Sequence, residues 1–289
     1  MAEQAKINLP INLGLNDGTI CPQSCIEVMQ AHNTITSLRN YTSSLNTPLL
    51  DVISEVDGVK PENIYLAHGS GPILKQCIPH LVKSKITGSA SKMLKHFISK
   101  NAFPIISGRL TYFKVPLKAG NAGLQIKLLP LDENTGWKLQ PEDVVNTLKQ
   151  GDGLVYICNP NNPTGQLMLT REEIIKLVEQ FPNSLFWVDE AYVQYISQSE
   201  HQPLSDLVPK YKNLFVSRTF STPPSATSLF ITFISRTIFH HLWFHNDIDF
   251  IHIISKQFFQ TVEIVCILIK RIVVARNNIH RHTCSTHRV

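Results

Sequence analysis

The clearest pattern of apolar and polar positions lies between residues 153 and 188. Residues 153–158 and 185–188 form two continuous apolar runs of strand length, as expected for strands that are covered on both faces. Between them, Thr170–Glu173 has the S/T-x-x-E form of a capping box, and apolar residues then recur at helical spacing at Ile174, Leu177, Val178 and Phe181. The segment is therefore predicted to fold as strand, helix, strand with a parallel crossover.

Similar alternation runs from about residue 49 onward. Pro141 at a first-turn position, followed by two acids, predicts a helix through Lys149. Apolar residues at 73–82 predict another helix, which follows the turn 68–72. Alternating helices and short strands predict an α/β fold, a three-layer domain with a largely parallel sheet. Residues 1–40 show no sustained period and are predicted to be an N-terminal arm that crosses the surface or reaches a partner subunit.

Composition excludes several classes of function. The chain has 289 residues, of which 43% are hydrophobic, enough to bury a sizeable core. Its 27 Lys and Arg against 22 Asp and Glu give a net charge of +5, too small and scattered to predict a nucleic-acid partner. The six cysteines form no C-x-x-C pair, which favours neither a zinc site nor a disulfide framework and fits a reducing cytoplasm. The first residues do not resemble a secretory signal, and no apolar stretch is long enough to predict a membrane span.

The character of the chain changes near residue 221. Residues 1–221 contain all 13 glycines and 19 of the 22 acids. Residues 222–289 contain no glycine, 12 Ile against 3 Leu, and seven of the 12 histidines. Seven Lys or Arg against three acids give this segment a charge of +4, so nearly all the excess positive charge lies there.

Two polar clusters follow the two predicted strands directly. Asn159–Gly165 follows the first strand and Asp189–Tyr192 follows the second, so both are expected beyond the carboxyl ends of parallel strands, where open α/β sheets bind ligands. Taken singly, the first cluster is also typical of an ordinary Pro and Asn turn. Asp189 alone is also typical of a helix N-cap or of a partner for a buried amide.

Together, these clusters resemble the fold-type-I pyridoxal-phosphate aminotransferases, and most of all their histidinol-phosphate-aminotransferase-like members. The N-P-x-N-P-T-G form of 159–165, the D-x-A-Y form of 189–192 and the run 217–221 carry the resemblance, which covers about residues 40 to 221. It implies that residues 41–221 are an incomplete pyridoxal-phosphate-binding large domain. It also implies amino-group transfer between an amino acid and a 2-oxo acid, and a homodimer.

The resemblance assigns residues to the cofactor ring. Asp189, as an anion, would pair with the protonated pyridine nitrogen and keep the ring an electron sink. Asn162 and Tyr192 would hydrogen-bond the phenolic oxygen of the ring. Tyr112 aligns less closely with the aromatic residue that stacks on the ring, and it is equally typical of a core aromatic residue.

It also assigns residues to the cofactor phosphate. Gly69, Ser70 and Gly71 would present backbone N–H groups and the positive end of a helix to the phosphate. Thr219 and Ser221 match the hydroxyl contacts that the family makes to the phosphate. Tyr41 is a weaker candidate, for a phosphate contact made across the dimer.

The chain departs from the family at the catalytic lysine. The family has, directly after this run, the lysine that forms the Schiff base with pyridoxal phosphate, and here Thr222 stands at that position. Threonine has no amine and cannot form that bond or transfer the substrate proton. The next lysine, Lys256, has no family pattern around it and is typical of a surface residue. No catalytic residue is therefore assigned: activity is expected to be abolished or very weak, with any cofactor held non-covalently, and dimerisation of this chain is doubtful.

Two accounts of residues 222–289 remain open. A shifted reading frame after the codon for Ser221 explains both the missing lysine and the altered composition, and it would make these residues an aberrant tail with the small domain missing. Alternatively, they are a real replacement segment whose apolar residues from Phe250 to Ile269 bind a membrane surface or a partner. His241 and His245 have helical metal-ligand spacing but no plausible third ligand, so no metal site is predicted.

Three hypotheses follow for the function. The chain is a defective aminotransferase remnant, a working transaminase or related decarboxylase whose true sequence continues with lysine in another frame, or a non-catalytic scaffold that binds through its tail. The missing lysine favours the first hypothesis. Substrate identity does not follow from these residues.

Overall fold

A computed structural model describes residues 46–68, 103–121, 123–197, 199–219 and 229–234, and the isolated positions 23, 27 and 30. Several sequence-based predictions lie outside these residues: the arm 1–40, Tyr41, the phosphate loop Gly69–Ser70–Gly71, the helix at 73–82, Ser221, Thr222, and the tail except for 229–234.

The strand, helix, strand unit forms as the sequence predicts. Strand β4 (Leu154–Cys158) and strand β5 (Leu185–Asp189) pair in parallel, and helix α9 (Arg171–Gln180) connects them. The capping box is present: the Glu173 N–H donates to Thr170 Oγ1 over 3.2 Å, and the Thr170 N–H donates to Glu173 Oε2 over 2.8 Å. These two bonds satisfy backbone donors that the first turn of a helix leaves without partners, and so they fix the start of α9.

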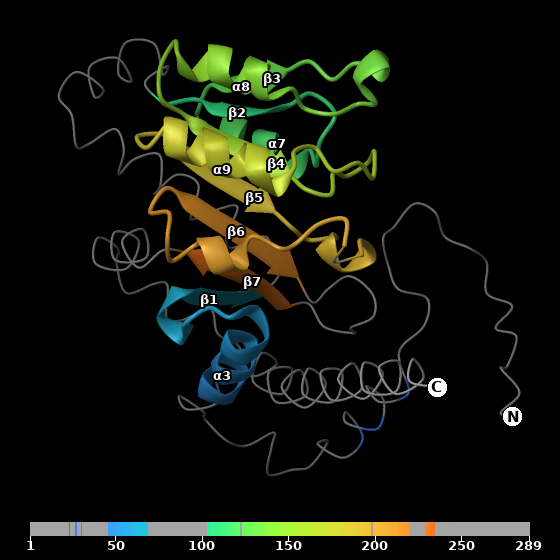
Figure 1. Ribbon diagram of the computed structural model, residues 1–289, viewed down its shortest axis with the longest axis vertical. Helices are drawn as coiled ribbons and strands as arrows, with labels where there is room; N and C mark the ends of the chain where they lie inside the picture. Colours follow the sequence, from blue (N-terminus) through green and yellow to red (C-terminus); the bar gives the residue numbers. More distant parts are fainter. Residues whose placement is uncertain are drawn as a thin grey trace, which may run out of the picture.

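The described strands form one seven-stranded sheet in the order β1-β7-β6-β5-β4-β2-β3 (Figure 1). Five of them, β3, β2, β4, β5 and β6, pair in parallel, which confirms the predicted α/β fold with a largely parallel sheet. Of the two remaining strands, β1 lies at the edge of the sheet, and β7 is antiparallel to both β1 and β6. The other strand bounds are β1 Ile64–His68, β2 Ile105–Gly108, β3 Ile126–Leu129, β6 Leu214–Thr219 and β7 Leu229–Ile234.

Strand β7 comes from the segment that composition sets apart. It lies between β1 and β6 and pairs with both along its length, with Ile64 opposite Phe233 and Phe215 opposite Ile234. The sheet therefore takes one strand from beyond residue 221, where the sequence pattern places the end of the large domain.

Helices cover both faces of the sheet (Figure 1). On one face, α8 (Pro141–Leu148) and α9 pack their apolar stripes against the sheet, as does α3 (Asn46–Asp57) beside β1. On the other face, α7 (Lys114–Asn121) packs against a cluster that contains Tyr156, Trp187 and Phe215. The helix predicted from Pro141 is thus confirmed, and the predicted three layers are present. Short 3-10 turns lie at Pro61–Asn63, Glu133–Thr135, Val193–Tyr195 and Ser205–Leu207.

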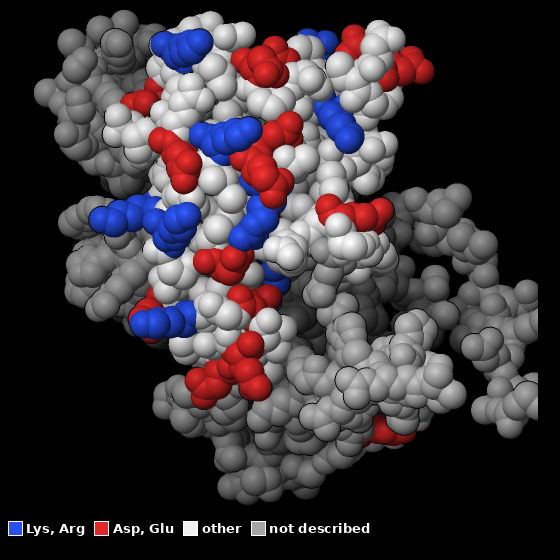
Figure 2. Space-filling view, in the orientation of Figure 1, with Lys and Arg blue, Asp and Glu red and all other residues white. Residues whose placement is uncertain are grey.

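The outer face of the α8 and α9 layer is polar and of mixed charge. Lys and Arg side chains alternate there with Asp and Glu side chains (Figure 2). This is the distribution expected of an amphipathic helical layer whose other side is buried. In the part of the chain that the structure describes, no helix is long and apolar enough to cross a membrane.

Candidate functional site

The described site residues gather at one edge of the sheet. Tyr112 follows β2, Asn162 follows β4, Asp189 ends β5 and Thr219 ends β6, and these four strands run parallel. The loops after neighbouring strands are joined: Thr111 donates to Asn161 Oδ1 over 2.8 Å, and Asn162 Nδ2 donates to the Tyr192 hydroxyl over 3.2 Å. Four strand ends thus meet at this edge, and the two polar clusters lie beyond the carboxyl ends of parallel strands, as the sequence pattern predicts.

The three asparagines of the 159–165 loop differ in their surroundings. Asn159 is fully buried and binds the segment that follows the loop. Its side chain accepts from the Met168 N–H over 2.7 Å and donates to the Leu169 carbonyl over 3.0 Å. Asn161 is also buried and donates to the Leu110 carbonyl over 2.8 Å. These two amides hold the loop shape. Asn162 is only half-buried and directs its amide to Tyr192, which leaves it accessible to a ligand.

Asp189 is the charged residue at the centre of this edge. Its side chain is buried, with 5% of the residue exposed, and its two carboxylate oxygens accept from two neutral hydroxyl groups. Tyr156 donates to Oδ2 over 2.8 Å and Ser217 donates to Oδ1 over 2.9 Å. Burial raises the pKa of Asp189, and these hydrogen bonds together with one from the Ala191 backbone oppose the rise.

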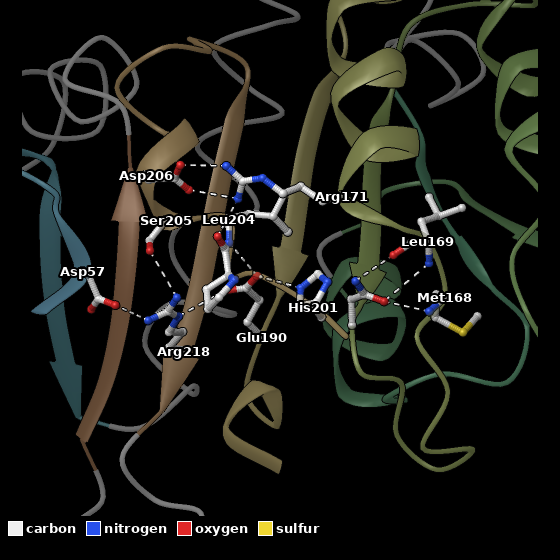
Figure 3. A network of polar contacts seen from close by, with 12 residues as sticks. Asp57, Met168, Leu169, Arg171, Glu190, His201, Leu204, Ser205, Asp206 and Arg218 are labelled. Carbon is white, nitrogen blue, oxygen red and sulfur yellow. Dashed lines mark hydrogen bonds and ion pairs between the residues drawn. The ribbon is translucent and has the colours of Figure 1, made fainter. Parts of the chain in front are cut away.

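A second acid, on the other face of the sheet, has a cationic partner, which no residue in the described part of the chain provides for Asp189. Glu190 directly follows Asp189 in the sequence, and Arg218 directly follows Ser217, so their side chains point to the opposite face of the sheet. There, Arg218 Nε lies 3.0 Å from Glu190 Oε2 (Figure 3). Arg218 also pairs with Asp57 of α3. Among the described ion pairs none includes Asp189. The same two strands therefore set an acid beside an arginine on one face and an acid beside a serine on the other.

Two further predicted contacts lie at the same edge. Tyr112 is half-buried and packs on the cluster of α7, with Lys114 Nζ 5.8 Å from its ring centre, so both interpretations of this residue place an aromatic ring beside the site. Thr219 is 6% exposed, and its carbonyl accepts from Gln194 over 3.5 Å. The cofactor contacts assigned to these residues stay predictions.

Three residues that contact or orient Asp189 were not singled out from sequence. They are Tyr156, Trp187 and Ser217, and Trp187 Nε1 donates to Ser217 Oγ over 2.8 Å. The strand register sets Tyr156 beside Trp187 and sets Asp189 beside Ser217. A polar residue at every second position of apolar strands was the available signal, because such residues share one face.

A known protein family matches this sequence over about half of its length. Residues 80–229 match the model of aminotransferase class I and II. The chain belongs to this family. The match covers β2 to β6 and ends at the first residue of β7, so it spans every described strand end of the site.

Curated relatives of this aminotransferase chain include two histidinol-phosphate aminotransferases. Histidinol-phosphate aminotransferase 2 of Legionella pneumophila (strain Paris) is 30% identical over 199 residues, which cover 68% of this chain and 48% of that protein. The histidinol-phosphate aminotransferase of Methanococcus maripaludis (strain C5) is 31% identical over 212 residues, covering 73% of this chain and 51% of that protein. The chain thus spans about half the length of the curated relatives it matches.

Solved structures show the same fold. A putative histidinol-phosphate aminotransferase from Erwinia carotovora atroseptica matches with a TM-score of 0.69 at 17% identity, over 89% of this chain and 68% of that chain. A histidinol-phosphate aminotransferase from Sinorhizobium meliloti, solved in complex with pyridoxal-5'-phosphate, matches with a TM-score of 0.66 at 16% identity, over 91% of this chain and 66% of that one. The aminotransferase large-domain fold predicted from sequence is confirmed.

Proposed function

We propose that this chain binds pyridoxal 5'-phosphate non-covalently at the carboxyl edge of its sheet and derives from an enzyme that transfers an amino group from an amino acid to a 2-oxo acid. The catalytic step itself is expected to be abolished or very weak in the chain as written. Family membership supports the lineage, and the arrangement around Asp189 supports the binding.

The single observation that carries the proposal is the buried carboxylate of Asp189 without a cationic partner among the described residues. A buried charge is costly unless it is paired, and strongly perturbed carboxyl groups cluster at functional sites. Two hydroxyl groups orient the Asp189 carboxylate but leave its negative charge in place. A protonated pyridine nitrogen is both a hydrogen-bond donor and a cation, so its chemistry fits this carboxylate.

The neighbouring donors fit the remainder of the ring. Asn162 and Tyr192, joined over 3.2 Å, have an amide N–H and a hydroxyl that can donate to the phenolic oxygen of the cofactor ring. Tyr112 sets an aromatic ring at the same edge. Pyridoxal phosphate, when bound, supplies an electron-withdrawing ring conjugated to the amino group of the substrate, and the charge of Asp189 sustains that electron withdrawal.

The loss of activity is inferred from Thr222. The family's lysine supplies an amine that binds the cofactor and moves the substrate proton, and a threonine hydroxyl does neither at neutral pH. Binding without covalent attachment then rests on the phosphate contacts, Asp189 and Asn162. A homodimer is part of the same proposal only as a family property.

The test is a titration of the full chain with pyridoxal phosphate, followed by absorbance, with borohydride reduction and peptide mapping at saturation. We expect reversible binding, and no reduced adduct on the peptide that contains Thr222. Asp189→Asn is expected to weaken binding at least about tenfold, since it removes a buried charge-assisted hydrogen bond. Asp206→Asn, at a carboxylate that is 52% exposed, is the matched control and is expected to bind like the unaltered chain.

Outcomes of this test separate the alternatives. Equal affinity in Asp189→Asn and in the unaltered chain contradicts the assigned site. Amino-acid-dependent half-transamination well above that of free cofactor contradicts the inactivity. A folded chain that binds no pyridoxal phosphate supports instead a scaffold that has kept only the fold. Thr222→Lys is expected to yield a borohydride-reduced adduct on its own peptide.

A further inference from the structure

Three buried hydrogen bonds are directed toward the Asp189 carboxylate, two of them in series on one side and one on the other. Trp187 Nε1 lies 2.8 Å from Ser217 Oγ, and Ser217 Oγ lies 2.9 Å from Asp189 Oδ1. On the other side, the Tyr156 hydroxyl lies 2.8 Å from Asp189 Oδ2. Trp187 and Tyr156 are each 1% exposed and Ser217 is fully buried, so water does not compete for these bonds.

The indole of Trp187 sets the direction. An indole N–H donates and never accepts, so Ser217 Oγ is the acceptor of that bond. A serine hydroxyl has one hydrogen, and the geometry directs it at Asp189 Oδ1. A proton on Oδ1 would require Ser217 Oγ to accept from Trp187 and from Asp189 at once and to turn its own hydrogen away from the carboxylate. Trp187 therefore acts through Ser217 to keep Oδ1 an acceptor.

Protonation at the other oxygen is also opposed. A proton on Oδ2 would require the Tyr156 hydroxyl to accept it and to turn its own hydrogen away, toward the sulfur of Cys158, which is only a weak acceptor. The titratable groups that face Asp189 from β4 are neutral, because burial raises the pKa of Tyr156 well above its usual value and that of Cys158 to about 12. The charge of Glu190 adds repulsion, which also raises the pKa of Asp189. The hydrogen bonds to Asp189 lower its pKa and so oppose the rise that burial and this repulsion cause.

We propose that Trp187 and Ser217 are positioning residues that hold Asp189 as a hydrogen-bond-accepting anion, and so make the site selective for a protonated pyridine ring over a neutral ring of the same shape. This inference rests on the proposed function for the identity of the ring, but the state of Asp189 is a property of the protein without cofactor.

The experiment has two readouts on the full chain. The first is the titration midpoint of the Asp189 carboxyl in the cofactor-free protein, followed by NMR with carboxyl-labelled aspartate and assigned by Asp189→Asn. Trp187→Phe removes the N–H donor and frees Ser217 to accept, so the midpoint is expected to rise by about one pH unit, a tenfold change in the protonation equilibrium. Trp137→Phe, the same change at a residue that is 37% exposed, is the control and is expected to leave the midpoint unchanged.

The second readout is the ratio of affinities for pyridoxal phosphate and for its 1-deaza analogue, which lacks the ring nitrogen. The ratio is expected to fall about three- to tenfold in Trp187→Phe, in step with the midpoint. If Trp187→Phe does not fold, benzothienylalanine at position 187 keeps the ring volume and replaces only the N–H. An unchanged midpoint and an unchanged ratio in the folded variant overturn the inference. Failure of the unaltered chain to bind either ligand overturns the proposed function instead, and the midpoint then decides the inference alone.

Discussion

Removal of Arg218 provides the sharpest test of how the site-bearing strands are held. Its guanidinium contacts Glu190 over 3.0 Å, Ser205 over 3.1 Å and Asp57, with 11% of its side chain exposed (Figure 3). Arg218→Met keeps the aliphatic stem but leaves the buried Glu190 carboxylate and the half-buried Asp57 carboxylate without the arginine. Breaking a buried ion pair in this way costs about 3–5 kcal/mol. The Leu204 N–H still contacts Glu190 over 2.9 Å, so the lower end, about 3 kcal/mol, is expected.

The assay is urea unfolding at pH 7 followed by circular dichroism, with Arg171→Met as control. Arg171 contacts Asp206 through two bonds of 2.7 and 3.0 Å, but Asp206 is 52% exposed, so water and salt screen the pair and its loss is expected to cost about 1 kcal/mol. Both variants lose an arginine with a similarly small exposed fraction, and Arg171→Met also loses a bond to the Pro203 carbonyl, so the main difference is the burial of the carboxylates: 52% exposed for Asp206 against 0% for Glu190.

The stability lost in Arg218→Met is expected to depend on pH. Burial already raises the pKa of Asp57 despite the neighbouring Arg218. Without the arginine, Asp57 would bind its proton more tightly in the folded state than in the unfolded one, so the cost of its charge is fully present at pH 7 and shrinks as the pH falls toward about 4. A loss in Arg218→Met that matches the loss in Arg171→Met at pH 7, or that does not shrink at pH 5, would refute this reasoning.

Three further predictions use the same unfolding measurement. Burial raises the pKa of Asp189, so its ionisation opposes folding above about pH 4. The variant Asp189→Asn is therefore expected to be at least as stable as the unaltered chain at pH 7, and the difference is expected to vanish toward pH 4. A clear loss of stability in the variant at pH 7 would contradict this. Gly153→Ala would place a Cβ 2.8 Å from the Pro104 carbonyl oxygen and is expected to lower the free energy of unfolding by about 1–3 kcal/mol. The control is Gly108→Ala, whose Cβ would lie 3.4 Å from its nearest atoms and which is expected to change that free energy by less than about 1 kcal/mol. Thr170→Ala removes the cap of α9 and is expected to cost about 1 kcal/mol, and no loss would show that the capping box contributes little.

The parts of the fold that sequence predicts are those with local signals. The capping box at Thr170 and the helical stripe behind it lie within a dozen residues, and α9 follows them closely. The apolar runs 153–158 and 185–188 are long enough to identify β4 and β5. Strand β7 is also an apolar run apart from Thr232, but that pattern does not give its place in the sheet, which depends on pairing with β1, far away in the sequence.

The candidate site divides in the same way. Asp189, Asn162 and Tyr192 were predictable because each follows an apolar strand in a motif of specific spacing, and the structure brings them to one edge. Trp187 and Ser217 were not, because an isolated Trp or Ser in an apolar strand is ordinary. Only the register, which aligns Asp189 with Ser217, shows that they form one chain of hydrogen bonds.

The position of β7 between β1 and β6 also has a consequence for synthesis on the ribosome. Strand β1 emerges early, yet within the described sheet its only neighbour is β7, whose Phe233 lies opposite Ile64. Until residue 234 has left the exit tunnel, β1 and β6 each keep an open hydrogen-bonding edge, and open edges are templates for aggregation. A nascent chain released at residue 221 would keep both edges open permanently. Chaperone demand is therefore expected to be set less by the site-bearing strands than by the delay before this one strand arrives.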